Sequence, residues 1–121
     1  MLQKQRQRER QAFRAAFQGI VKVVAQERHM RFHLVAAVAV ILFAWCLELS
    51  SLEWVAVIFA IALVLTAELL NSALEAVVDL VSPQRQAKAG YAKDAAAGAV
   101  LIASISAFFI GCIVFLPKLF G

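Results

Sequence analysis

Long apolar runs separated by short polar segments dominate the sequence. Three stretches carry few or no charges: residues 32–49, 54–67 and 95–116. A helix that crosses the hydrocarbon layer of a membrane needs about 20 such residues. The pattern therefore predicts an all-α integral membrane protein with three transmembrane helices, at 32–52, 54–81 and 95–116.

The segment before the first apolar run has a different pattern. Between residues 6 and 27, apolar side chains recur at three- and four-residue spacing, with basic and amide side chains offset from them. The apolar positions are Phe13, Ala16, Phe17, Ile20 and Val24. Such a pattern predicts an amphipathic helix on the inner membrane surface. A helix packed on the bundle is the alternative.

Composition and charge favour a membrane protein. The chain of 121 residues is 63% hydrophobic, whereas soluble domains contain about 45–50% apolar residues. No secretory signal peptide is evident, so the first apolar run is expected to be retained. The net charge of +4 is attributed to topology and attraction to anionic lipid. No nucleic-acid partner is expected, because aromatic residues are not interleaved with the basic ones.

Lys and Arg predict the orientation of the chain in the membrane. Eight of the twelve precede the first span and three lie between the second and third, while the 49–53 connection has none. Cytoplasmic segments are enriched in these residues. The N-terminus and the 82–94 loop are therefore predicted to be cytoplasmic. Cys46 and Cys112 fall near the outer ends of their helices, where a disulfide and burial as small apolar residues are both conceivable.

Four polar residues form one line along the second predicted span. Glu68, Asn71, Glu75 and Asp79 are spaced by three, four and four residues, which places them on a narrow stripe of a helix. Counting about 20 residues from Trp54, taken as an interfacial anchor, puts the inner boundary between Asn71 and Glu75. Glu68 would then lie inside the cytoplasmic leaflet. Ionisable residues inside a membrane are candidates for function.

Two further polar clusters are predicted to reach the same boundary. Glu27 precedes the first span, and Lys93 and Asp94 precede the third. Three carboxylates at one level, from Glu27, Glu75 and Asp94, would repel one another without a cation between them. Mg²⁺ suits such a site because it binds few carboxylates and keeps positions for phosphate oxygens. Glu68, which lies deeper, could act as a general base.

The residues alone leave three interpretations open. An enzyme that transfers phosphate from a nucleotide to a lipid fits an acidic site at the cytoplasmic interface. A small transporter with carboxylate-based coupling also fits, although the internal repeats common in transporters are not seen. Hydrogen bonds that only specify helix packing are the third interpretation.

Several motifs resemble the small prokaryotic diacylglycerol kinase family, most closely its Gram-positive undecaprenol kinase branch. The strongest are "ELLNSALEAVVD" at 68–79 and "AKDAAAGAVL" at 92–101, supported by "ERHMRFH" at 27–33. The resemblance implies a homotrimeric lipid kinase of the cell membrane that uses ATP. Its substrate would be undecaprenol, with diacylglycerol as the alternative. Consistent with a kinase unrelated to the soluble ones, the chain has no GxxxxGK[ST] loop.

The resemblance also implies roles for individual residues. Glu68 would be the catalytic base, with Asn71 near it. Glu27 and Glu75 would hold Mg²⁺ and ATP.

Three further residues match nucleotide contacts of the family: Lys93, Asp94 and, at a looser match, Arg8. The loop "SPQRQAKAGY" departs from the family's other loops, so no contacts are carried over to it. His29 stands where this branch usually has Asn. His29 and His33 have the i, i+4 spacing of metal ligands, but their interfacial location favours a packing or head-group role.

Overall fold

The computed structural model describes residues 1–121 as four α-helices without a strand. The helices are α1 (Leu2–Gln26), α2 (Arg28–Cys46), α3 (Ser51–Val81) and α4 (Ala87–Phe120). The last three are long and apolar enough to cross a membrane. The predicted all-α class with three candidate membrane spans is therefore confirmed.

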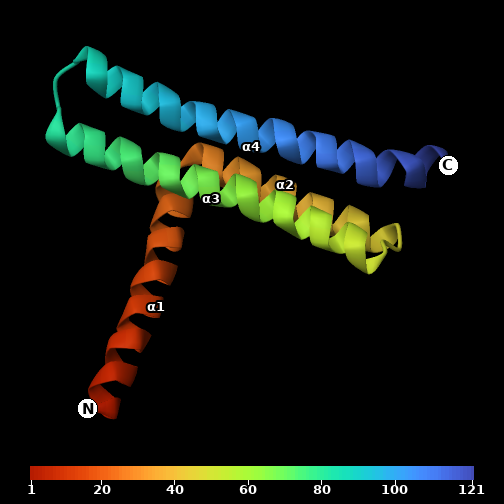
Figure 1. Cartoon of the computed structure of the whole chain (residues 1–121), viewed down its shortest axis with the longest axis horizontal. Helices are drawn as coiled ribbons and strands as arrows, with labels where there is room; N and C mark the ends of the chain where they lie inside the picture. The colour runs from red at the N-terminus through yellow and green to blue at the C-terminus, as the bar shows by residue number, and fades with distance from the viewer.

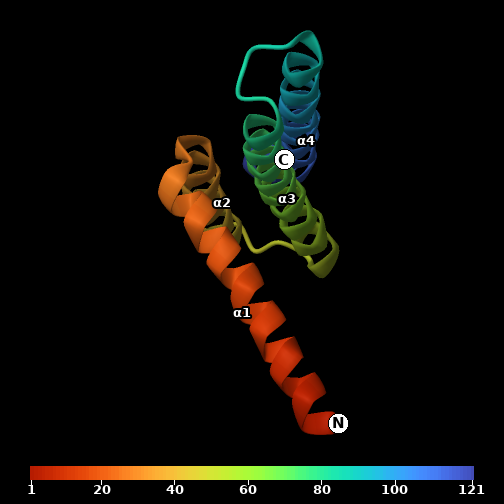
Figure 2. The ribbon, with the colours of Figure 1, turned by 90° about the vertical axis from the view of Figure 1, so that its left-hand side faces the viewer.

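Three of the helices form a bundle and the fourth leaves it. α3 and α4 run side by side in opposite directions, and α2 lies beside α3 (Figures 1 and 2). α3 packs more extensively against α4 than against α2. α1 departs at a steep angle from the start of α2, partway along α3, and carries the N-terminus away from the bundle (Figure 1).

The bend between α1 and α2 is a single extended residue, Glu27, with φ −104° and ψ 115°. The Arg31 guanidinium donates hydrogen bonds to the carbonyl oxygens of Val24 and Ala25, at 3.1 and 2.8 Å. The last carbonyls of a helix have no partner within the helix. Arg31 therefore satisfies the free end of α1 and holds Glu27 at the bend.

A capping box defines the start of α3. The Ser50 hydroxyl accepts a hydrogen bond from the Glu53 backbone at 3.2 Å, and the Glu53 carboxylate accepts one from the Ser50 backbone at 3.1 Å. This reciprocal pair satisfies two backbone donors that a helix start leaves free. α3 consequently begins at Ser51, ahead of the predicted start at residue 54.

Other boundaries also differ from the prediction. The helix expected at 32–52 ends at Cys46, and Glu48 then takes a left-handed φ of 53°, which reverses the chain into α3. The loop expected at 82–94 is shorter, because α4 already begins at Ala87. The segment that follows Ala87 is rich in alanine and lysine, which favour helix over loop.

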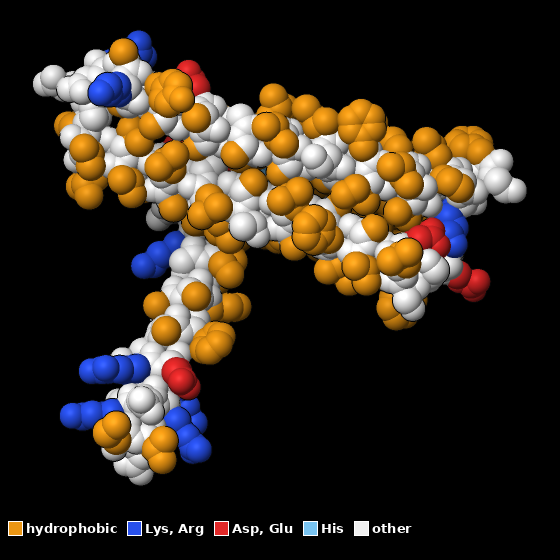
Figure 3. Space-filling view, viewed as in Figure 1, with side chains coloured by type: hydrophobic (Ala, Val, Ile, Leu, Met, Phe, Trp, Pro, Cys, Tyr) orange, Lys and Arg blue, Asp and Glu red, His pale blue; other side chains and the backbone are white.

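Most of the surface of the single chain is apolar. Only nine of 121 residues are buried, and hydrophobic side chains cover the visible face of the bundle (Figure 3). No residue of α1 is buried, and Phe13 and Phe17 are exposed. Both cysteines are free, and Cys46 is exposed rather than buried. An exposed apolar surface of this extent indicates contact with lipid or with other protein chains, because exposure of apolar surface to water is unfavourable.

Lys118 joins α4 to the α2–α3 turn. Its ammonium lies 3.2 Å from the Glu53 carboxylate and donates a hydrogen bond to the Glu48 carbonyl oxygen at 3.3 Å. Hydrogen bonds from the backbone and hydroxyl of Ser50, with help from Lys118, hold the pKa of Glu53 below its usual value. Glu53 precedes the predicted span at 54–81. We call this end of the bundle the hairpin end.

The Lys118 contacts lead to a stability prediction. Lys118→Met should lower the melting temperature of the detergent-solubilised protein by a few degrees, because it removes a partner from both Glu53 and the Glu48 carbonyl oxygen. The matched control is Lys88→Met, since Lys88 is an exposed lysine of the same helix without an ion pair. Equal melting temperatures for the two variants would show that the contact at the hairpin end contributes nothing.

Candidate functional site

Glu68 is the one ionisable residue that the chain buries, with 3% of its surface exposed. It extends the buried face of α3, which is formed by Val57, Ala60 and Val64. A charged group in apolar surroundings is costly unless it is paired. The position of Glu68 is thus set by helix packing, and its side chain faces protein rather than lipid.

His33 of α2 is the partner of Glu68. Its Nε2 atom lies 3.7 Å from Oε2 of Glu68, and the two side chains are 17% and 4% exposed. The ring of Phe32 packs edge-on against the imidazole, with ring centres 5.6 Å apart. The sequence pattern does not indicate this pair, and a packing or head-group role was expected for His33. His29, one turn earlier, is exposed and forms no ion pair.

Burial decreases along the polar stripe of α3. Glu68 is buried, Asn71 and Glu75 are half-buried, and Asp79 is exposed. The side-chain oxygen of Asn71 is itself buried and has no hydrogen-bond partner. A buried polar atom without a partner costs about 1–3 kcal/mol. Asn71 therefore carries an unmet hydrogen-bonding capacity one turn from Glu68.

Lys93 of α4 contacts Asp79 of α3 through an ion pair that also serves as a hydrogen bond. Lys93 precedes the predicted span at 95–116. The hydrogen bond that Lys93 donates to Asp79, followed by the charges of Asp79 and Glu75, raises the pKa of Lys93 above its usual value. The two side chains are 40% and 66% exposed, and such surface pairs contribute little stability. Lys93 is thus a cation that can readily change partners.

The structure does not gather all predicted site residues into one cluster. No group of three or more His, Cys, Asp or Glu side chains is placed to hold a metal ion. Glu27 is half-buried at the α1–α2 bend and Asp94 is exposed; neither forms an ion pair. Arg8 is exposed, on the part of α1 that leads away from the bundle (Figure 1).

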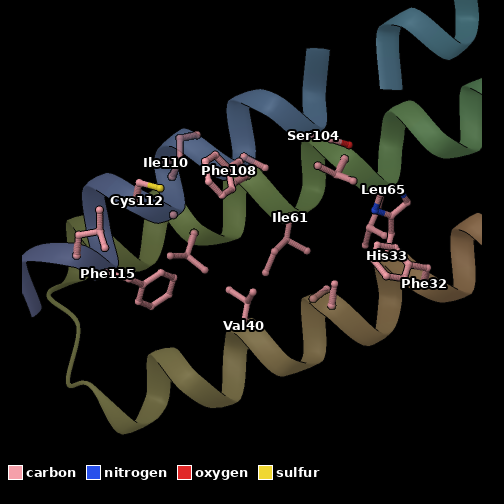
Figure 4. A pocket seen from close by; sticks show the side chains of 18 residues that line it. Phe32, His33, Val40, Ile61, Leu65, Ser104, Phe108, Ile110, Cys112 and Phe115 are labelled. Carbon is pink, nitrogen blue, oxygen red and sulfur yellow. The ribbon is translucent and has the colours of Figure 1, made fainter. Parts of the chain in front are cut away.

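An apolar cavity of about 550 Å³ lies between α2, α3 and α4. Fifteen of its 18 lining residues are hydrophobic, so it suits hydrocarbon rather than a charged group. Phe32 and His33 lie at one end and Phe115 at the other (Figure 4). His33 therefore faces both the cavity and the buried carboxylate of Glu68.

Comparisons with known proteins agree with these features. The family model described as "Prokaryotic diacylglycerol kinase" matches residues 14–115. An undecaprenol kinase from Bacillus subtilis is 41% identical over 108 residues, covering 89% of this chain and 88% of that protein. A diacylglycerol kinase from Synechocystis is 42% identical over 109 residues, covering 89% of this chain and 62% of that protein. One from Escherichia coli K12 is 35% identical over 98 residues, covering 81% of this chain and 80% of that protein.

The buried oxygen of Asn71 leads to a prediction about stability. Asn71→Leu should leave the melting temperature unchanged or raise it, because it removes a polar atom without a partner and keeps the branching of the side chain at Cγ. Thermal unfolding in detergent measures this. Asn71→Asp, of nearly the same shape but charged, serves as the comparison and should be less stable. If the Leu variant loses as much stability as the Asp variant, the oxygen has a partner in the working assembly.

Proposed function

The chain belongs to the prokaryotic diacylglycerol kinase family of lipid kinases, and we propose that the lipid alcohol it phosphorylates is undecaprenol. The product would be undecaprenyl phosphate, with ATP as the phosphate donor. The observation that carries the proposal is Glu68, a buried carboxylate within an apolar helix. A general base that acts on a membrane-embedded hydroxyl must lie within the apolar part of the protein, as Glu68 does. Membership of a kinase family favours this activity over transport.

Glu68 is assigned the role of general base. Phosphoryl transfer depends mainly on positioning and on neutralisation of charge. The lipid hydroxyl would lose its proton to Glu68 as its oxygen attacks the γ-phosphate. Asn71 follows Glu68 on the same helix face, and its free carbonyl oxygen could accept a hydrogen bond from the same hydroxyl. This would explain why a costly buried amide is retained there.

Glu27 and Glu75 are assigned to Mg²⁺ and ATP. Each is a half-buried carboxylate, and Mg²⁺ takes one or two carboxylates and completes its shell with water and substrate phosphates. When bound, the ion would neutralise charge on the phosphates. The charge of Glu75 acts on Lys93, so these two residues belong to one electrostatic environment.

Lys93, Asp94 and Arg8 are assigned to the nucleotide. Lys93 is charged, and its exposed contact with Asp79 can be exchanged for a phosphate oxygen. Arg8 lies on a helix that leaves its own bundle. We therefore propose that Arg8 reaches a nucleotide held by another subunit of a homotrimer. Association of subunits would also cover part of the exposed apolar surface.

The proposed membrane is the cell membrane, with the N-terminus in the cytoplasm. The rings of Trp45 and Trp54 meet edge-on at the hairpin end, with centres 6.4 Å apart. Tryptophan is enriched where a protein crosses the boundary between membrane and water. The hairpin end would then lie at the outer surface. Glu27, Glu75 and Lys93 would lie at the cytoplasmic side, where ATP is available.

Undecaprenol is favoured over diacylglycerol by the branch that the motifs resemble and by the B. subtilis relative. Diacylglycerol remains the alternative, because relatives of similar identity are named diacylglycerol kinases. The apolar cavity beside His33 suits either hydrocarbon. The identity of the lipid therefore needs a direct assay.

The assay compares the two lipids side by side in detergent micelles with labelled ATP. We expect label in undecaprenol at a kcat/KM at least severalfold above that for diacylglycerol. Phosphorylation should stop when EDTA removes divalent cations and resume when Mg²⁺ is added in excess. Preference for diacylglycerol would overturn the choice of lipid, and insensitivity to EDTA would overturn the metal assignment.

Glu68→Gln tests the assigned base in the same assay. Turnover should fall at least about 100-fold, because the amide cannot accept the proton, while the protein stays folded and extractable. The control is Glu48→Gln, since Glu48 is exposed in the turn and contributes its carbonyl oxygen rather than its carboxylate to a contact. Near-normal turnover by Glu68→Gln would rule out this role.

A further inference from the structure

We propose that His33 is a positioning residue for Glu68. Paired with the imidazole, the buried carboxylate would be held in an orientation toward the lipid hydroxyl. The inference rests on the proposed role of Glu68 as general base. It adds a residue from α2 to a site otherwise assigned to α3, α4 and the chain around the α1–α2 bend.

Geometry supports an action through charge. The 3.7 Å between His33 Nε2 and Glu68 Oε2 is too long for a good hydrogen bond but within the range of an ion pair. At this distance an opposite charge favours the ionised form of a carboxyl group. The side chain of Glu68 is 4% exposed, so solvent screens the interaction little.

No other cation faces Glu68. His33 is its one ion-pair partner, and the cavity residues contributed by α4 are all uncharged. Arg31, two positions from His33 on α2, turns its guanidinium toward the carbonyl oxygens at the end of α1. Lys93, the nearest cation assigned to the site, is engaged with Asp79. His33 is therefore the group that can compensate the buried charge.

The compensation matters to the reaction because only the carboxylate form can act as a base. As the lipid O–H bond breaks, its proton moves to Glu68. The lipid oxygen then bonds to the γ-phosphorus, and the bond from that phosphorus to ADP breaks. A neutral Glu68 at the start of this step could not accept the proton. By holding the carboxylate in place, His33 would set the fraction of enzyme that is ready to react.

The test compares His33→Gln with His29→Gln, a matched change at the exposed histidine one turn earlier. With undecaprenol and saturating Mg²⁺–ATP, kcat should fall between about 10-fold and about 100-fold in His33→Gln. It should be unchanged in His29→Gln. The KM for ATP should stay the same in both variants, because neither histidine is among the residues assigned to the nucleotide.

Rescue by a second cation separates positioning from a purely structural role. His33→Lys, which supplies a permanent cation, should recover part of the kcat that His33→Gln loses, whereas a loss caused only by disturbed packing would not be recovered by lysine. It also tests the inference if His33→Gln fails to fold.

Two results would overturn the inference. One is a kcat for His33→Gln equal to that of His29→Gln. The other is a kcat for His33→Lys that is no higher than that of His33→Gln. Either result, obtained while Glu68→Gln is inactive, would refute the role of His33 and leave the proposed function intact. If the unmodified protein phosphorylates neither lipid, the proposed function itself fails.

Discussion

The cost of placing a carboxylate inside an apolar helix determines how this molecule is arranged. Glu68 must face protein, so the face of α3 that carries it has to be the packed one, and Val57, Ala60 and Val64 continue that face. It must also have a partner, and α2 supplies His33 at 3.7 Å. The packing of α2 against α3 is therefore a requirement of the site as much as of the bundle.

The rest of the bundle places its polar contacts where water can reach them. Lys118 and Glu53 pair at the hairpin end, and Lys93 and Asp79 pair near the α3–α4 loop, all with partly exposed side chains. Between these ends the helices present apolar surface. Exposed pairs contribute little stability, so Lys93 and Asp79, the more exposed of the two pairs, can exchange partners without loss of the fold. The buried Glu68 does not have that freedom.

Sequence patterns could predict the features that depend on one helix alone. Apolar length indicated α2, α3 and α4, and the spacing of four polar residues indicated the stripe headed by Glu68. Contacts between helices could not be predicted in this way, because nothing in the local sequence distinguishes His33 from His29 as the partner of Glu68. Two boundaries were missed for local reasons. Ser50 and Glu53 have the spacing of a capping box, which moves the start of α3 earlier, and the alanine-rich segment after Ala87 extends α4.

Glu68 and Asn71 differ in how the structure compensates them, and this difference bears on function. The carboxylate of Glu68 has a partner within its own chain, whereas the buried oxygen of Asn71 has none. A chain optimised for packing alone would place a leucine at position 71, since a buried polar atom without a partner is a net cost. Retention of the amide is best explained by a partner that comes from outside the chain. The hydroxyl of a lipid alcohol at Glu68 would be such a partner until its proton passes to Glu68, one turn away on the same helix.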